Sequence, residues 1–145
     1  YVSPLFARSS GLAKSVSAEI GMVLGNHSLH RIENHLKFWE LGHIRNLNID
    51  ELSGGWAQIL LFSLFITRNV DSTDIFLIDG FRNISPKNVK NLLRRASQVF
   101  HGKMNILEVT TNFAETYKHC SMPGLSFAVL SYDDFCRGYK LTKGP

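Results

Sequence analysis

One short stretch of this chain constrains its fold more than any other feature. The run Leu52–Trp56 reads Leu-Ser-Gly-Gly-Trp, and the apolar segment Trp56–Thr67 that it opens has the length of a helix. A helix that is apolar on every side is expected to be buried. Ile75–Ile78 then forms a short apolar run typical of an interior parallel strand, and Asp79 follows it. This order predicts an α/β fold with a mostly parallel sheet.

Two amphipathic segments precede this stretch. Leu12–Leu24 and Leu29–Leu41 each place apolar residues on one helical face. Between them, residues 25–28 form a turn in which Ser28 is placed to cap the second helix. Gly42 is the expected C-cap of that helix. The first fifty residues are therefore predicted to be a helical section.

After Asp79 the pattern predicts alternating helices and strands. Ser85 and Pro86 are an N-cap and a first helical residue for a helix that extends to Phe100. That helix is expected to bury Val89, Leu92, Leu93, Ala96 and Phe100, with Lys87, Lys90, Arg94 and Arg95 facing outward. The later expected elements are a strand at Asn105–Thr110, a helix at Phe113–His119, and a hairpin that pairs Leu125–Leu130 with Arg137–Leu141 across Tyr132-Asp133-Asp134.

Composition is that of an ordinary globular chain, with 145 residues, 44% apolar and 19% charged. The net charge of +4 suits anionic partners but does not choose among nucleotides, lipid headgroups and RNA. Cys120 and Cys136 stand in no metal-binding spacing and are expected to be free thiols. No window is long and apolar enough to span a membrane, and no secretory signal is visible at the start.

The Ser-Gly-Gly run makes physical sense as an anion site. Ser53 supplies a hydroxyl, and Gly54 and Gly55 let the backbone approach a phosphate closely. The helix that follows adds free N–H groups and the positive end of its dipole. The same residues also suit an ordinary turn and helix cap. Gln58 and the strand ending in Asp79 follow at a spacing that favours the binding interpretation.

Taken together, these residues resemble the signature motif and Walker B strand of ATP-binding-cassette (ABC) ATPases. The resemblance covers nearly the whole chain and implies the C-terminal part of a P-loop NTPase domain. It implies a helical subdomain over residues 1–50 and a signature helix with an α/β core over residues 51–145. It also implies ATP and Mg²⁺ as cofactors, with Asp79 positioning the metal. The nucleotide contacts implied are Leu52, Ser53, Gly54, Gly55 and Gln58.

The chain departs from the family where hydrolysis takes place. Gly80 stands where the family has its general-base Glu, and Thr111 or Asn112 stands at the switch histidine. Ser85-Pro86 replaces the usual Leu-Asp of the D-loop, and no Gly-x-x-x-x-Gly-Lys-Ser/Thr loop occurs in the sequence. The chain is therefore not expected to hydrolyse ATP alone, and no intact catalytic residue is predicted.

By this resemblance the chain is a degenerate or split nucleotide-binding subunit of an ABC transporter. Its expected partners are a chain with a Walker A loop, a partner cassette and membrane-spanning permease subunits. The expected location is peripheral, on the cytoplasmic or organelle-matrix face of a membrane. The end Thr110-Thr111-Asn112 is similar to the Thr-Thr-His of the ATPases that serve cytochrome c maturation with haem-handling membrane subunits.

Two alternatives stay open. Leu-Ser-Gly-Gly-Trp also resembles the branch that acts on ribosomes or nucleic acid, but that branch keeps the Walker B Glu, so direct nucleic-acid binding is not favoured. The chain could also be a structural subunit of a larger assembly. His27, His30 and His35 lie close together in sequence, but no Cys or carboxylate joins them at metal-binding spacing, so they are interpreted as polar residues on the surface and not as metal ligands.

Overall fold

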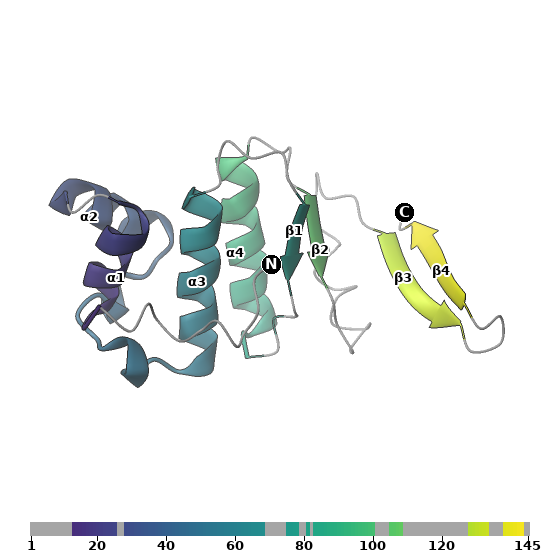
Figure 1. Ribbon diagram of the computed structural model, residues 1–145, viewed down its shortest axis with the longest axis horizontal. Helices are drawn as coiled ribbons and strands as arrows, with labels where there is room; N and C mark the ends of the chain where they lie inside the picture. Colours follow the sequence, from purple (N-terminus) through teal and green to yellow (C-terminus); the bar gives the residue numbers. More distant parts are fainter. Residues whose placement is uncertain are drawn as a thin grey trace. The chain divides into compact units, whose positions relative to one another are not determined.

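A computed structural model describes the chain in part (Figure 1). Side chains are described for residues 13–25, 28–68, 81 and 83–100, and the backbone alone for four strands. The chain divides into two compact units, residues 1–111 and residues 112–145. All the helices described lie in the first unit. This division does not test the predicted boundary at residue 50 between a helical subdomain and an α/β core, so that boundary stays a prediction.

The helices follow one another closely along the first unit. They are α1 (Val16–Val23), α2 (Leu29–Phe38), α3 (Gly54–Arg68) and α4 (Pro86–Val99), with the short 3₁₀ helices η2 (Gly42–Ile44) and η3 (Ile49–Glu51) between α2 and α3. Apolar spacing predicted helices before Leu41 and after Ser85, and the structure has α1, α2 and α4 there. Leu12 and the predicted helix Phe113–His119 lie outside the described residues.

The first helix is held at its N-terminus by the loop that precedes α3. Ser15 is its N-cap, and the Ser15 hydroxyl accepts a hydrogen bond from the Ala18 N–H. The Val16 N–H donates to the Leu47 carbonyl at 3.1 Å, and the Ser17 N–H donates to the Arg45 carbonyl at 3.1 Å. These bonds satisfy N–H groups that a helix start leaves without intrahelical partners.

The second helix ends in a Schellman motif rather than at Gly42. The Leu41 N–H donates to the Leu36 carbonyl at 2.8 Å, and the Glu40 N–H donates to the Lys37 carbonyl at 3.3 Å. Glu40 has a φ of 58°, so a glutamate occupies the left-handed position that usually belongs to glycine. The prediction of Gly42 as the C-cap is therefore wrong, because Gly42 instead begins η2.

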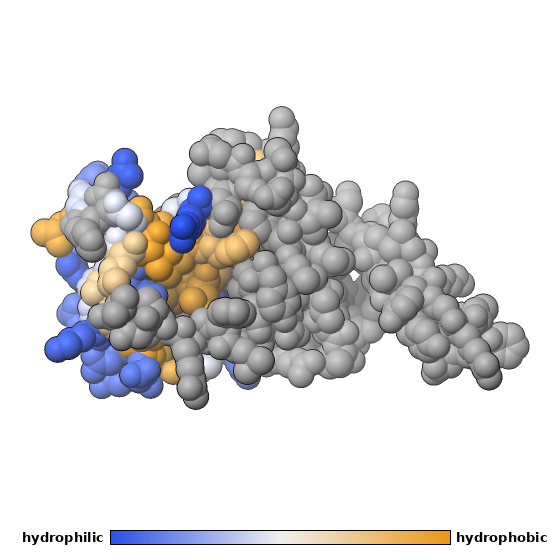
Figure 2. All heavy atoms as spheres, viewed as in Figure 1, coloured by the Kyte–Doolittle hydropathy of each residue, from blue (hydrophilic) through white to orange (hydrophobic). Residues whose placement is uncertain are grey.

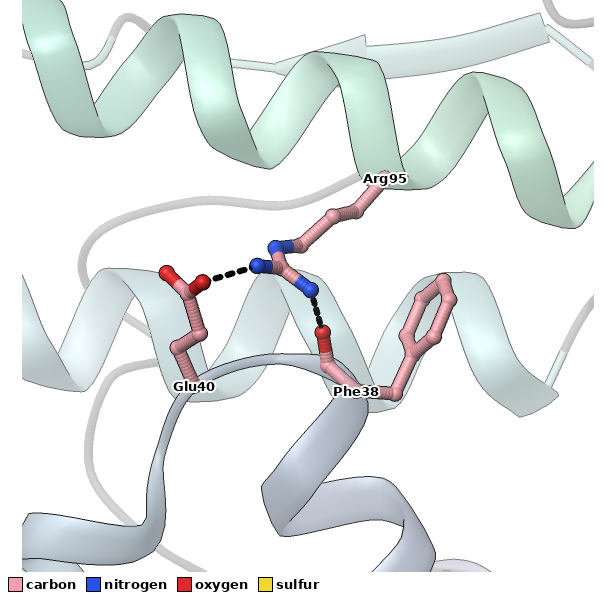
Figure 3. A network of polar contacts seen from close by, with 3 residues as sticks. All are labelled: Phe38, Glu40 and Arg95. Atoms are coloured by element: carbon pink, nitrogen blue, oxygen red, sulfur yellow. Dashed lines mark hydrogen bonds and ion pairs between the residues drawn. The ribbon is translucent and has the colours of Figure 1, made fainter.

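An arginine from α4 binds this helix end (Figure 3). The Arg95 guanidinium donates to the Phe38 carbonyl and to the Glu40 carboxylate, and it also lies 5.8 Å from the centre of the Phe38 ring. A cation at a helix C-terminus complements both the free carbonyls and the dipole. The expectation that Arg95 faces solvent is wrong, since only 14% of its side chain is exposed.

Apolar side chains from all four helices form the core. Figure 2 shows apolar atoms gathered on this face about where α1 and α3 lie, flanked by hydrophilic ones. Trp39 of α2 packs edge-on against Phe62 of α3, with ring centres 6.3 Å apart. The least exposed large side chains in the described part are Phe62, Ile20, Leu36, Leu41, Leu60, Ile66, Val16 and Val89. α3 also contacts α1 and α4, so helices cover it on several sides.

The last helix confirms its predicted pattern except at Arg95. The Ser85 hydroxyl accepts a hydrogen bond from the Asn88 N–H, and Pro86 is the first helical residue. The expected apolar face is buried, namely Val89, Leu92, Leu93, Ala96 and Phe100. Lys87, Lys90 and Arg94 are exposed.

The strands form two separate pairs. In the first unit, β1 (Ile75–Ile78) runs parallel to β2 (Asn105–Glu108), with Ile75 opposite Asn105. In the second unit, β3 (Ala128–Asp133) runs antiparallel to β4 (Gly138–Lys143). Tyr132 and Asp133 were expected in the hairpin turn but pair as strand residues, opposite Tyr139 and Gly138.

The predicted fold class, an α/β P-loop domain built on a mostly parallel sheet, is wrong. Helices make up 73% of the part of the chain described with side chains, and no strand lies in that part. The physical reason is that the apolar surface of α3 is covered by other helices, so the described core forms between helices. Among the described residues, no helix is long and apolar enough to cross a membrane.

Replacing Arg95 with Met should destabilise the first unit by about 1–2 kcal/mol. The variant leaves the Phe38 carbonyl without its donor and Glu40 without its counter-charge. Chemical denaturation followed by circular dichroism measures the change. The exposed neighbour Arg94 is the matched control, and Arg94→Met should change stability much less. Equal effects from both variants would contradict an anchoring role for Arg95.

Candidate functional site

The Ser-Gly-Gly run lies at the start of α3. Gly54 and Gly55 are its first two residues, so the helix begins two residues before the predicted start at Trp56. The Ser53 carbonyl accepts a hydrogen bond from the Ala57 N–H at 2.9 Å. The Ser53 hydroxyl accepts from the Trp56 N–H at 3.4 Å, a long bond for this pair of atoms. Ser53 therefore acts as the N-cap, and its side chain is only weakly engaged.

Two backbone donors remain at this helix start. No described residue accepts a hydrogen bond from the N–H of Gly54 or Gly55. Ser53 and Gly54 are exposed and Gly55 is half-buried, so the turn is accessible from solvent. Free N–H groups together with the positive end of a helix dipole favour a negatively charged group. The geometry of Ser53, Gly54 and Gly55 is thus compatible with an anion.

Asn83 lies directly against both glycines. A Cβ at Gly55 would come within 2.3 Å of the Asn83 carbonyl oxygen, which real Cβ atoms do not tolerate. A Cβ at Gly54 would meet the Asn83 side-chain amide at 3.3 Å. Gly55 is therefore required for the close approach of two backbones, whereas Gly54 faces a side chain that can move.

The segment that carries Asn83 is fixed to α3 by apolar packing. The Ile84 N–H donates to the Phe81 carbonyl at 3.0 Å and closes a turn around Asn83. Phe81 packs against Phe62 of α3, with ring centres 5.8 Å apart, and Ile84 is buried. The approach of Asn83 to Gly55 is therefore held from both sides of the turn.

One turn into α3, Gln58 has a buried acceptor without a partner. Its Oε1 atom is buried and makes no hydrogen bond with a described residue, although the residue as a whole is half-buried. An unsatisfied buried carbonyl costs free energy, so a donor that reached it would stabilise the site. Gln58 is also one of the residues that the sequence implied as nucleotide contacts.

Acidic residues precede the turn. Asp50 and Glu51 belong to η3, and the Glu51 carboxylate accepts a hydrogen bond from the Asn48 N–H at 2.9 Å as part of a capping box. Leu52 is the C-cap of η3 and leads into Ser53. These carboxylates oppose an anion at the turn, so the attraction must come from the backbone N–H groups and from a partner's cations.

The remaining predicted site residues lie outside the described residues. They are Asp79, expected at the metal, Gly80 at the general-base position, and Thr111 and Asn112 at the switch-histidine position. The described structure therefore brings together Leu52, Ser53, Gly54, Gly55 and Gln58 without testing Asp79. Among the described residues, no three His, Cys, Asp or Glu side chains are grouped to hold a metal ion.

Asn83 and a buried polar cluster were not found from the sequence. His35 of α2 bonds through Nε2 to the Ser63 hydroxyl at 3.0 Å, and its Nδ1 lies 3.4 Å from the Thr67 hydroxyl. The Trp39 indole N–H donates to the same Thr67 hydroxyl at 3.2 Å. Both hydroxyls also donate to backbone carbonyls of α3, those of Leu60 and Ser63. The spacing of His35 and Trp39 by four residues was the available signal.

Burial changes the acid–base behaviour of His35. The residue is 5% exposed, and this desolvation lowers its pKa from the usual 6.5 to about 4. His35 is therefore neutral at pH 7, with one ring nitrogen a donor and the other an acceptor. Each of the two neighbouring hydroxyls already donates to a carbonyl of α3, so the ring nitrogen that carries the proton donates to one of them. His35 thus belongs to the packing of α2 on α3.

Comparisons of the chain with models of protein families, with curated proteins and with solved structures give no match. The resemblance to ABC ATPases therefore depends on the quoted motifs alone and stays a prediction.

Replacing Gly55 with Ala should destabilise the first unit by about 1–3 kcal/mol, because the new Cβ overlaps the Asn83 carbonyl. Gly54→Ala is the matched control, since the Asn83 side chain can move away and alanine favours helix over glycine by up to about 1 kcal/mol. Thermal unfolding of both variants measures the difference. Equal stability of the two variants would show that Asn83 does not approach Gly55 closely.

The lowered pKa of His35 predicts a pH-dependent stability. Between pH 6.5 and about 4 the unfolded chain binds a proton at this residue and the folded chain does not. The contribution of neutral His35 to the free energy of unfolding is therefore fully present above pH 6.5. It is lost as the pH drops toward 4, by up to about 3 kcal/mol. In His35→Gln this contribution should vanish from denaturation curves measured at several pH values.

The exposed His30 provides the control for this experiment. His30→Gln should keep the pH dependence of the unmodified chain. If His35→Gln and the unmodified chain lost stability in parallel over this range, His35 would not be the buried neutral group described.

Proposed function

We propose that this chain is a non-hydrolysing subunit of an ABC-type transport complex. In this proposal the N-terminal turn of α3, residues 52–55, contacts the terminal phosphate of ATP that a partner cassette holds. The proposal needs only the helical part of the first unit and assigns no P-loop domain to this chain. The observation that carries it is the accessible helix start. There, no described residue accepts a hydrogen bond from the N–H groups of Gly54 and Gly55.

The rigidity of this turn supports the proposal. Gly55 is pressed against the Asn83 backbone, and Asn83 is fixed in turn by the packing of Phe81 on Phe62. Donors held in place before the anion arrives lose little freedom when it binds, which favours affinity. The Oε1 atom of Gln58 nearby is buried and has no partner among the described residues, so it would accept a hydrogen bond from a ribose hydroxyl or a partner's N–H group only after its side chain turned outward.

The electrostatics of the turn explain why a partner is required. Asp50 and Glu51 lie just before the turn, so this chain alone would attract a polyanion weakly. A partner with a Walker A loop would supply the lysine and the metal site that carry most of the binding. The turn of α3 would then complete a site that is already charged.

Attachment to a membrane would come through the partners. We place the chain on the cytoplasmic or organelle-matrix face, bound to permease subunits, with haem export for cytochrome c maturation as the system suggested by the end Thr110-Thr111-Asn112. The helices α1 and α2 are the expected contact with those subunits, following the family resemblance of the residues before the signature.

Ser53→Arg in the native complex tests the proposal. The arginine side chain fills the space in front of Gly54 and Gly55, so the complex should lose ATPase activity by about a hundredfold or more. Gln98→Arg is the control, because Gln98 is exposed on α4 and belongs neither to the turn nor to α1 or α2. It should leave turnover unchanged.

Two measurements separate the possible outcomes. Co-purification in mild detergent shows whether the variant still assembles with its partners, and circular dichroism shows whether it is folded. Full ATPase activity in an assembled, folded Ser53→Arg complex would overturn the proposal and favour a structural subunit. Co-purification with ribosomal or DNA-associated proteins in place of membrane proteins would favour the nucleic-acid alternative.

A further inference from the structure

A groove of about 830 Å³ lies at the opposite end of α3 from the Ser-Gly-Gly turn. The last residues of α1 and α3, one side of α2 and the end of α4 form its walls. This volume is within the range of sites for small organic ligands, which is about 300–1,000 Å³. The groove shares no residue with residues 52–55 or with Gln58, so an inference from it is independent of the proposed nucleotide contact.

The walls of the groove are mainly apolar. Val23, Leu24, Phe38 and Val99 line it and are all half-buried, so each keeps apolar surface that a ligand can cover. Trp39 also lines it but is only 3% exposed, and the Arg95 guanidinium lies over one face of the Phe38 ring, so little aromatic surface is open for a planar ring to stack on. The walls therefore suit a flexible aliphatic chain better than a nucleobase or another flat aromatic group.

Two arginines stand among these lining residues. Arg31 of α2 and Arg68 of α3 are exposed, and neither forms an ion pair with a described residue. Arg45 and Arg95, by contrast, are paired with Glu33 and Glu40. None of the described lining residues is an aspartate or glutamate. The groove thus combines apolar walls with positive charge that no described residue neutralises.

The polar groups at the bottom of the groove already have partners. His35 and Thr67 are hydrogen-bonded to each other and to α3, and His35 is neutral at pH 7 because burial lowers its pKa to about 4. A ligand therefore gains little from this side. Its charged group must instead meet Arg31 and Arg68, whose planar guanidinium groups bind carboxylates through paired hydrogen bonds.

We propose that this groove binds a free single-chain fatty acid, with the aliphatic chain against Val23, Leu24 and Val99 and the carboxylate bound by the arginines that line the groove, Arg31 and Arg68. Apolar burial supplies most of the affinity, and the arginines select the charge and the orientation. A phosphate head would satisfy the same arginines, so the test compares free acids with phospholipid.

Calorimetric titration of the purified chain with dodecanoate, below its micelle concentration, tests the proposal. Saturable binding is expected, while dodecyltrimethylammonium, which has the same chain and the opposite charge, should bind at least tenfold more weakly. The double variant Arg31→Glu/Arg68→Glu should weaken dodecanoate binding by about tenfold or more. Arg94→Glu is the matched control, because Arg94 is an exposed arginine that does not line the groove, and it should bind as the unmodified chain does.

A second variant tests the walls without changing charge. Val99→Trp should narrow the groove and weaken binding of dodecanoate more than that of octanoate, whereas Leu29→Trp, at an exposed position outside the groove, should have no effect. Equal binding of both amphiphiles, or unchanged affinity in the double arginine variant, would overturn the proposal. Binding to phosphatidylglycerol vesicles without binding to monomeric dodecanoate would also overturn the proposal. That result would mean that Arg31 and Arg68 bind a membrane surface and not a free acid.

Discussion

The contact that the rest of the helical structure depends on is the buried polar one between α2 and α3. His35 meets Ser63, and four residues further along each helix Trp39 meets Thr67. Two matched contacts at this spacing favour one register, because a shift by one turn would keep at most one of them and leave a buried imidazole or indole without its partner. Apolar packing alone would tolerate such a shift more easily. This register in turn sets the position of α3 along α2, and with it the positions of the Ser-Gly-Gly turn at the start of α3 and of the groove at its end.

The end of α2 is held in place by hydrogen bonds to its last backbone groups. Glu40 takes the left-handed conformation that closes α2, which costs a glutamate more than a glycine. Arg95 offsets that cost, since it binds the Glu40 carboxylate and the Phe38 carbonyl together. A glycine would satisfy the backbone but would leave Arg95 without its counter-charge. The residue at this position therefore joins α4 to the α2 end as well as ending the helix.

The sequence predicted local structure better than it predicted the fold. Apolar spacing and the pair Ser85 and Pro86 identified α4 because they depend on neighbours within a few residues. Arg95 was assigned to solvent because its partners lie more than fifty residues away. The parallel-sheet class was wrong because an all-apolar helix such as α3 indicates burial but not what covers it. Asn83 had no sequence signal, since its contact with Gly55 depends on tertiary packing.

Because the helix dipole of α3 has a direction, its two ends interact differently with an anion. The helix has fifteen residues, so its ends lie about 22 Å apart. At its start, the dipole favours an anion without any side-chain charge, and so do the N–H groups of Gly54 and Gly55, from which no described residue accepts a hydrogen bond. At its end, the carbonyls and the negative end of the dipole oppose an anion, and Arg68 in the last turn compensates for them. An anionic ligand in the groove therefore depends on arginines more strictly than a phosphate at the turn does, which is why both guanidinium groups carry the selectivity there.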